Sequence, residues 1–434
     1  MAHVSYHMDH DGAYTVEEAS SIGLYAAEDA RIANGSHPFH EDVDNLNCPC
    51  GCSQDDLAML SDATSSGGWS ARDYPSRPSK TGTSRRKRPG PKLRKIRLLP
   101  KGEKLEAIRQ SEIEKSDKYL RQAFSNMTQF DDISLRDLVN KKKAGKARRW
   151  PRHLQKEETY WPSSGGHLAV DKDGLPLVVH VPNFVGPIGR RRLYRGLRAF
   201  GREVGVKIRR GADAGKRDNI KGYPFYKKEG YINGIFQLVG AWTAIGHPDD
   251  EPVPASDVLR NGRLFRTSMN LLRELSFRSS ILDHVLSKLD AAAYAVLHEG
   301  RARLIAENAA YAAVTSLDPT YMHGRSISFN RATRNHEDVR DPPEAWTPIL
   351  VLGKFKRGGK LIIQKLGLSM SYFPGTLIFV RGAVLPHEVD FFYGGQRISI
   401  AHFVHKAILR QVGITEIPIS SYKDSPYHVP TWTL

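Results

Sequence analysis

Three side chains in the C-terminal part of the sequence have the types that hold a redox-active metal ion. They are His336, Asp338 two positions later, and His387, which follows the aspartate by 49 positions (387 − 338). Two imidazoles and one carboxylate on one face of an octahedron hold non-haem Fe(II) and leave the opposite face open for oxygen and a cosubstrate. The sequence therefore predicts an iron site built from these three residues.

The His-x-Asp pattern is weak by itself, because it recurs elsewhere in the chain, at His7/Asp9, His40/Asp42 and His247/Asp249. The context of His336 distinguishes it from the other copies. Short apolar runs with turn signals between them surround it, which is typical of a ladder of strands. These runs begin at Ser326, Pro348, Lys360, Leu368 and Thr376.

A further candidate, Arg397, lies ten residues after His387 (397 − 387) on another strand-like run. Side chains alternate across a strand, so Arg397, Phe403 and His405 are expected on the same face. A buried guanidinium needs a counter-anion, and its planar fork fits a carboxylate held by two hydrogen bonds. The distal carboxylate of 2-oxoglutarate suits this role, since its 2-oxo acid end can chelate the iron.

Residues 325–405 resemble the Fe(II)/2-oxoglutarate dioxygenases, and among them the TET/JBP group, which oxidises methylated bases in DNA. The resemblance implies a double-stranded β-helix, Fe(II), 2-oxoglutarate and O2. It also implies that Arg331 is a second cosubstrate-binding arginine. Asp341 and His405 would hold the polar edge of the target base, and Phe403 would stack on it.

The implied enzyme is a dioxygenase that flips a methylated base out of DNA and oxidises its methyl group. On 5-methylcytosine the products would be 5-hydroxymethylcytosine and further oxidised bases. N6-methyladenine stays open as a substrate for oxidative demethylation, because Asp341 can accept a hydrogen bond from the exocyclic amine of either base. Two other interpretations also stay open: the same chemistry on RNA or protein, and a non-catalytic nucleic-acid-binding protein on a degenerate barrel.

Charge is unevenly distributed along the chain. Residues 1–70 hold twelve acidic residues against one base, a net charge of −11, so the rest must carry +28 of the total of +17. A basic body of this size favours a polyanionic partner, nucleic acid first, and the resemblance implies DNA. Two candidate rails for DNA are the basic run of residues 140–155, with Trp150, and a helix face bearing Arg191, Arg195, Arg198 and Arg202.

Composition divides the chain into four parts. We expect an acidic, largely disordered tail at 1–70 and a basic linker at 71–101. Nine lysines and arginines without an acid between Ser84 and Lys101 are typical of a nuclear localisation signal, so we expect a nuclear protein. Residues 102–160 form a helical, basic extension. Residues 161–434 form an α+β dioxygenase domain, a jelly-roll-like double-stranded β-helix buttressed by helices, expected to be a monomer.

The N-terminal part lacks an apolar signal region, and no run of about 18 apolar residues occurs, so neither secretion nor membrane spanning is expected. All three cysteines lie in Cys48-Pro-Cys50-Gly-Cys52, which fits a reducing compartment. The spacing differs from the Cys-x₂₋₄-Cys of ordinary zinc sites, and metal binding by these cysteines stays open.

Several elements are expected around the strand ladder. They are a helix from Gly102 to Asn126, a hairpin over the main barrel from His167 to Val181, apolar core from Tyr223 to Ile245, a helix capped by Ser256 that ends near Leu275, and another from Ser279 or Ser280 to His298. The serines are assigned to helix starts because a hydroxyl can accept a hydrogen bond from an unpaired N–H group there.

Overall fold

The computed structural model describes residues 7–8, 14–15, 102–145, 159–206, 230–244, 246–259, 261–331 and 333–428. Two units are distinguished, residues 1–94 and 95–434. In the first, β1 (His7–Met8) pairs antiparallel with β2 (Tyr14–Thr15). The expectations for the rest of the tail and the linker, including Cys48, Cys50, Cys52 and the localisation signal, lie outside the described residues, and the four-part division stays a prediction.

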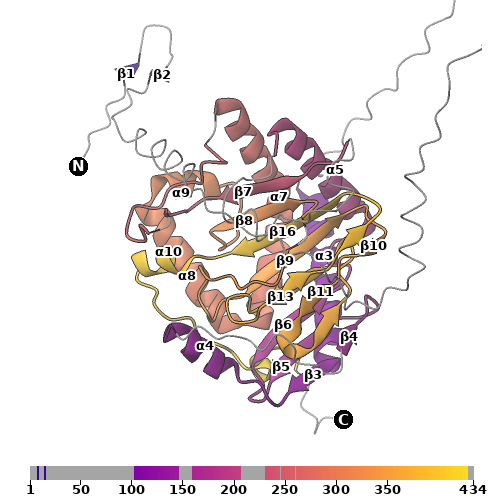
Figure 1. The fold of residues 1–434 in the computed structure, drawn as a ribbon. Coiled ribbons are helices and arrows are strands. Elements are labelled where there is room, and N and C mark those ends of the chain that lie inside the picture. The colour runs from indigo at the N-terminus through magenta and orange to yellow at the C-terminus, as the bar shows by residue number, and fades with distance from the viewer. Residues whose placement is uncertain are drawn as a thin grey trace, which may run out of the picture. The chain divides into compact units, whose positions relative to one another are not determined.

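An eight-stranded sheet is the centre of the second unit (Figure 1). Its strands, in spatial order, are β3 (Met127–Phe130), β5 (His167–Asp171), β6 (Pro176–Val181), β13 (Leu377–Val380), β9 (Thr347–Gly353), β16 (Arg397–Phe403), β8 (Gly324–Phe329) and β7 (Gly234–Val239). Neighbours pair antiparallel except β3 with β5. The expected hairpin is therefore β5–β6, but it belongs to this sheet instead of covering it, and every residue of β6 is buried.

A smaller sheet packs on the large one. It contains β14 (Glu388–Val389), β11 (Leu361–Ile363), β12 (Leu368–Met370) and β4 (Thr159–Trp161), and a separate ribbon pairs β10 (Arg357–Gly358) with β15 (Phe392–Tyr393). Along β9, Ile349 and Val351 join one apolar core with the smaller sheet, whereas Leu350 and Leu352 join a second core with the helices. The result is a mixed α/β fold with a large, mostly antiparallel sheet; the double-stranded β-helix stays a prediction.

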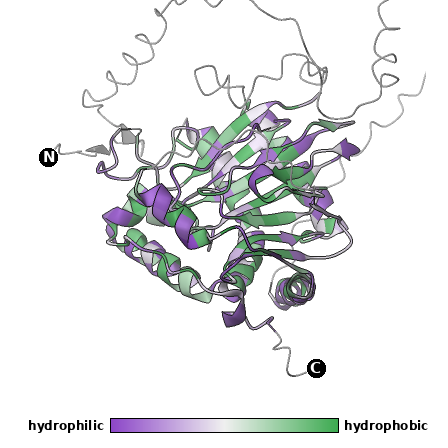
Figure 2. Ribbon diagram, turned by 60° about the horizontal axis from the view of Figure 1, so that its bottom comes forward, coloured by the Kyte–Doolittle hydropathy of each residue, from purple (hydrophilic) through white to green (hydrophobic). Residues whose placement is uncertain are grey.

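Most helices pack on the other face of the large sheet. They are α3 (Glu103–Ser125), α5 (Pro187–Glu203), α7 (Gly262–Leu289), α8 (Ala291–Glu307), the shorter α9 (Ala309–Thr315) and α10 (Lys406–Gln411), and the single turn η4 (Tyr422–Asp424). Helix α4 (Leu135–Lys143) and η3 (Gln364–Leu366) instead bury residues in the core between the two sheets. Helix residues alternate between hydrophobic and hydrophilic, as expected of elements with one buried face (Figure 2). In the described part of the chain, no helix combines the length and apolarity needed to cross a bilayer.

The helix boundaries differ from the expected ones at three serines. Helix α7 begins at Gly262 and is capped by Asn261, whose side chain accepts from the N–H of Leu264 at 3.1 Å, so the expected cap at Ser256 is wrong. Helix α7 runs without interruption through Ser279 and Ser280, whose hydroxyls donate to the carbonyls of Leu275 and Phe277 in the preceding turn. The hydroxyls thus bond inside the helix instead of capping a new one. The break occurs at Asp290, whose side chain caps α8 by accepting from the N–H of Ala293 at 3.3 Å.

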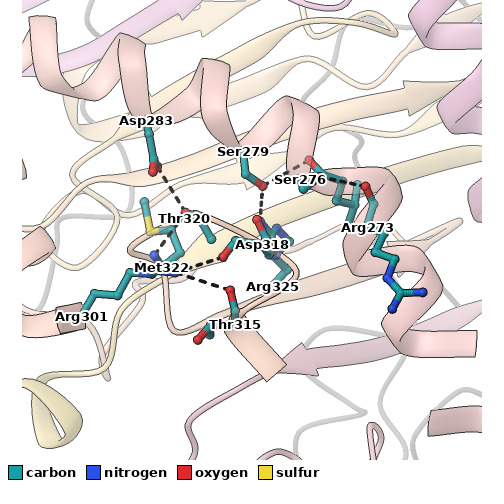
Figure 3. Close-up of polar contacts among 11 residues, drawn as sticks. Arg273, Ser276, Ser279, Asp283, Arg301, Thr315, Asp318, Thr320, Met322 and Arg325 are labelled. Atoms are coloured by element: carbon teal, nitrogen blue, oxygen red, sulfur yellow. Dashed lines mark hydrogen bonds and ion pairs between the residues drawn. The ribbon is translucent and has the colours of Figure 1, made fainter. Parts of the chain in front are cut away.

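A buried ionic cluster joins α7 to β8 and the loop before it (Figure 3). Arg325 of β8 forms an ion pair with Asp318 and donates to Ser279 Oγ at 2.7 Å. Asp283, one turn further along α7, accepts from the Thr320 hydroxyl at 3.4 Å. Burial, aided by the charge of Asp318, raises the pKa of Asp283 to about 7. Asp318, Thr320 and Arg325 line a cavity of about 20 Å³, room for about one water.

Candidate metal centre and substrate pocket

The backbone brings His336 and His387 together. Their segments form a single antiparallel bridge, with the His336 N–H donating to the His387 carbonyl at 3.1 Å and the reverse bond at 3.0 Å. Two residues further on, the Asp338 N–H donates to the carbonyl of Gly382 at 2.9 Å. Two segments that are 51 positions apart in the sequence, one with His336 and Asp338 and the other with His387, are thereby fixed together by main-chain hydrogen bonds.

The three side chains converge as well. Nε2 of His336 lies 3.7 Å from Asp338 Oδ1, and Nε2 of His387 lies 3.9 Å from Asp338 Oδ2. One potential ligand atom from each residue can be chosen so that all lie within 4.8 Å of one another. These separations are too long for hydrogen bonds, but they suit three atoms around a single cation.

The hydrogen bonds of the imidazoles determine which nitrogen can bind a metal. Nδ1 of His336 faces the carbonyl of Arg334 at 2.9 Å, and Nδ1 of His387 faces that of Leu385 at 3.1 Å. A carbonyl oxygen only accepts, so each Nδ1 carries the hydrogen and each Nε2 keeps a lone pair. Both lone pairs lie on the side of Asp338.

Asp338 is equally suited to a cation. Its Oδ2 atom is buried and accepts no hydrogen bond from any residue that the structure describes. A Cβ atom at position 382 would collide with this oxygen, so the glycine there provides the space for the carboxylate. Two imidazoles that turn Nε2 toward one under-bonded carboxylate oxygen fit Fe(II) in its facial arrangement.

Arg397 lies at the start of β16 with its side chain toward the smaller sheet. It is 1% exposed, and its guanidinium carbon lies 5.1 Å from the ring centre of Tyr372 and 5.5 Å from that of Phe392. Its Nη1 donates to the carbonyl of Arg331 at 3.3 Å. Arg331 is also buried, and burial lowers its pKa to about 10. Two desolvated guanidinium groups in adjacent segments favour an anionic ligand.

The residues expected to contact a base cluster at the other end of β16. The ring of Phe403 lies 4.7 Å from that of His405, and His405 Nδ1 lies 3.7 Å from Asp341 Oδ1. Both ring nitrogens of His405 are buried and make no hydrogen bond within the described residues, and the buried Asp341 carboxyl lies beside the Thr347 hydroxyl. These atoms can therefore bond the polar edge of a ligand.

Burial sets the protonation of this pair. It lowers the pKa of His405 to about 3, helped by the charge of Arg340 and opposed by that of Asp338. Burial and the charge of Asp338 raise the pKa of Asp341 well above its usual range. His405 is consequently a neutral imidazole, and the 3.7 Å approach between the two residues is not an ion pair.

Two residues at this end were missed by sequence reasoning. Trp242, assigned to the core, presents its ring edge-on to His405 at 5.2 Å, and Arg340 lies 4.6 Å above the Trp242 ring. Trp242 follows β7 and belongs to a segment nearly 100 residues before the ligand triad, so no local pattern connects it with the site. Tyr372 and Phe392 were also missed, because neither lies on the strand of Arg397 and only the fold brings their rings to its guanidinium.

The two candidate DNA rails differ in how many of their basic side chains are exposed and unpaired with acids. On α5, Arg191, Arg195 and Arg202 are exposed, whereas Arg198 donates to the Gly230 carbonyl at 3.2 Å. In the first rail, Lys142 and Lys143 form ion pairs with Glu337 and Glu344 and are not free for phosphate. Residues 146–155 of this rail, including Trp150, lie outside the described residues.

No protein-family model and no curated protein sequence matches the chain. Solved structures match at low similarity. NgTET1 in complex with 5mC DNA is 14% identical, over 70% of this chain and 91% of that one, with a TM-score of 0.40. An oxidoreductase of the 2OG-Fe(II) oxygenase family from Burkholderia pseudomallei is 12% identical, over 64% and 92%, with a TM-score of 0.30.

A third structure, the viral collagen prolyl hydroxylase of Paramecium Bursaria Chlorella virus-1 in its 2OG complex, is 16% identical over 18% of this chain and 56% of that one, with a TM-score of 0.16. These likenesses are too distant to carry an assignment.

Proposed function

We propose that this protein is an Fe(II)- and 2-oxoglutarate-dependent dioxygenase that oxidises the methyl group of a methylated DNA base. The observation that carries the proposal is the arrangement of His336, Asp338 and His387, in which both Nε2 lone pairs and a carboxylate oxygen lie on one side. When bound, iron, 2-oxoglutarate and O2 supply the oxidising power that an unactivated methyl group requires and that ordinary side chains lack.

In this proposal Arg397, supported by Arg331, binds the distal carboxylate of 2-oxoglutarate. The rings of Tyr372 and Phe392 keep water from the guanidinium, which strengthens its hydrogen bonds to a carboxylate. Arg397 and Phe403 are the two ends of one strand, on the same face of β16. The strand therefore separates a cosubstrate end from a substrate end.

A flat ring with a polar edge fits the substrate end. Phe403 offers a stacking face, while Asp341 and His405 offer buried polar atoms to the edge of the ring. A base inside a duplex cannot enter such a pocket, so the target nucleotide has to be flipped out. The exposed arginines of α5 can hold phosphates. We propose 5-methylcytosine as the substrate, with N6-methyladenine as the second candidate, since both carry an amine on that edge.

The proposal extends to a nuclear monomer, with the basic run from Ser84 to Lys101 as the localisation signal. Expression of the full chain with that run replaced by glycine and serine tests the location. Sedimentation of the purified protein tests the oligomeric state.

The test of the activity is incubation of the protein with Fe(II), 2-oxoglutarate and duplexes that carry either methylated base, followed by nucleoside mass spectrometry and a succinate assay. We expect hydroxymethylcytosine, and no product from His387→Ala. Succinate without a DNA product would reject DNA in favour of an RNA or protein substrate. The absence of iron-dependent succinate with any substrate would favour the non-catalytic alternative.

A further inference from the structure

Two consecutive lysines at the end of α4 contact the loop that carries part of the metal site. Lys142 forms an ion pair with Glu337, and Lys143 Nζ lies 2.5 Å from Glu344 Oε1. The segment between these two glutamates contains Asp338, a candidate metal ligand, and Asp341, a candidate base contact. Helix α4 of the N-terminal extension thus forms ion pairs with this loop at both of its ends.

Helix α4 is a firm support for these lysines. Ser134 caps its first turn, and the N–H of Leu135 donates to Asp171 Oδ2 at 2.7 Å. Leu135, Leu138 and Val139 are buried in the core between the two sheets. Packing and hydrogen bonds therefore fix the helix, so that its last turn can restrain a loop.

The loop needs such a restraint because of its charges. Glu337 stands between His336 and Asp338 in the sequence, so two carboxylates are adjacent and repel each other. Glu337 would also be a competing ligand for a hard cation if its carboxylate turned toward the metal. The Lys142 ammonium offsets the repulsion and holds the Glu337 carboxylate against α4. Both side chains are about one-quarter exposed, with values of 28% and 23%.

We propose that Lys142, with α4 anchored at Lys143, is a positioning residue for the metal centre: it fixes Glu337 and thereby the orientation of Asp338. This inference rests on the proposed function. It assigns to the N-terminal extension a role in metal binding that is separate from any contact with DNA. Groups that orient metal ligands typically contribute 10- to 100-fold to metal affinity.

The test compares Lys142→Met with Lys141→Met by titrating the metal-free protein with Co(II) and following its absorption. Lys141 is the matched control, since it is exposed on the same turn and has no ion pair among the described residues. We expect Lys142→Met to weaken Co(II) binding at least tenfold and Lys141→Met to change it less than twofold. Circular dichroism melts of the metal-free variants should agree within a few degrees.

A second variant approaches the pair from the other side. Glu337→Gln removes the charge that Lys142 holds in place, so Lys142→Met should cause little further loss of Co(II) affinity in the Glu337→Gln protein, because both substitutions remove the same interaction. Equal affinity of Lys142→Met and Lys141→Met would overturn the inference, as would independent, multiplying effects of the two substitutions. If the unaltered protein binds no Co(II), the proposed function fails at its metal site and the two failures are distinguished.

Discussion

Replacing Asp283 by asparagine should make the protein more stable at neutral and alkaline pH. The carboxyl is 8% exposed, its ordinary pKa is about 3.8, and burial raises the pKa to about 7. The folded protein therefore binds this proton more tightly than the unfolded chain does. Stability from the bound proton is complete below pH ~3.8 and is lost as the pH rises to about 7. Asparagine has a similar shape and no such proton to lose.

The size of the effect follows from the difference of roughly three pKa units. At about 1.4 kcal/mol for each unit, the free energy of unfolding of the aspartate form falls by about 4 kcal/mol relative to asparagine between pH 4 and pH 7. The difference should then stay constant above pH 7.

The assay is urea unfolding of both proteins from pH 5 to pH 8.5, monitored by tryptophan fluorescence. Every other titrating group is common to the two proteins, so the difference between their unfolding free energies isolates residue 283. We expect the asparagine form to gain steadily up to about pH 7. A difference that is independent of pH, or one that favours the aspartate at pH 8, would refute a raised pKa.

Three substitutions test the site. Arg397→Lys keeps the charge but loses the planar fork, so the KM for 2-oxoglutarate in succinate assays should rise roughly 10- to 100-fold; an unchanged KM would contradict carboxylate binding there. Gly382→Ala introduces a Cβ that collides with the Asp338 carboxylate and should weaken Co(II) binding at least tenfold in a titration, with a normal affinity speaking against the geometry. Phe403→Ala removes a stacking face worth about 1–3 kcal/mol, so the KM for methylated DNA should rise about 5- to 100-fold, and equal change in the KM for 2-oxoglutarate would argue against a base contact.

Local patterns predicted much of the strand framework. The run that contains Arg397 is β16, and alternation places Arg397 toward the smaller sheet while Ile398 and Ile400 join the helix-side core. The helix expected from Gly102 is α3. These features depend on periodicity along one segment, which a sequence displays directly.

Side-chain contacts between segments far apart in the sequence could not be predicted from local patterns. Lys142 belongs to a basic run that suggested a phosphate contact, but Glu337, 195 positions away, is its partner. Similarly, Ser279 looked like a helix start, although its hydroxyl bonds the preceding turn and Arg325 across the sheet. The role of a lysine or a serine is decided by which acceptor the fold brings to it, and one sequence does not contain that information.

The reciprocal main-chain bridge between His336 and His387 determines how the proposed metal centre would take up and release its ion. The entropy of closing the chain between these two positions is offset by folding and not by the ion, so departure of the cation should leave the imidazoles in place. In hydrogen–deuterium exchange, the two amides should stay protected in chelator-treated protein. Such a centre can be stripped and refilled repeatedly without local refolding.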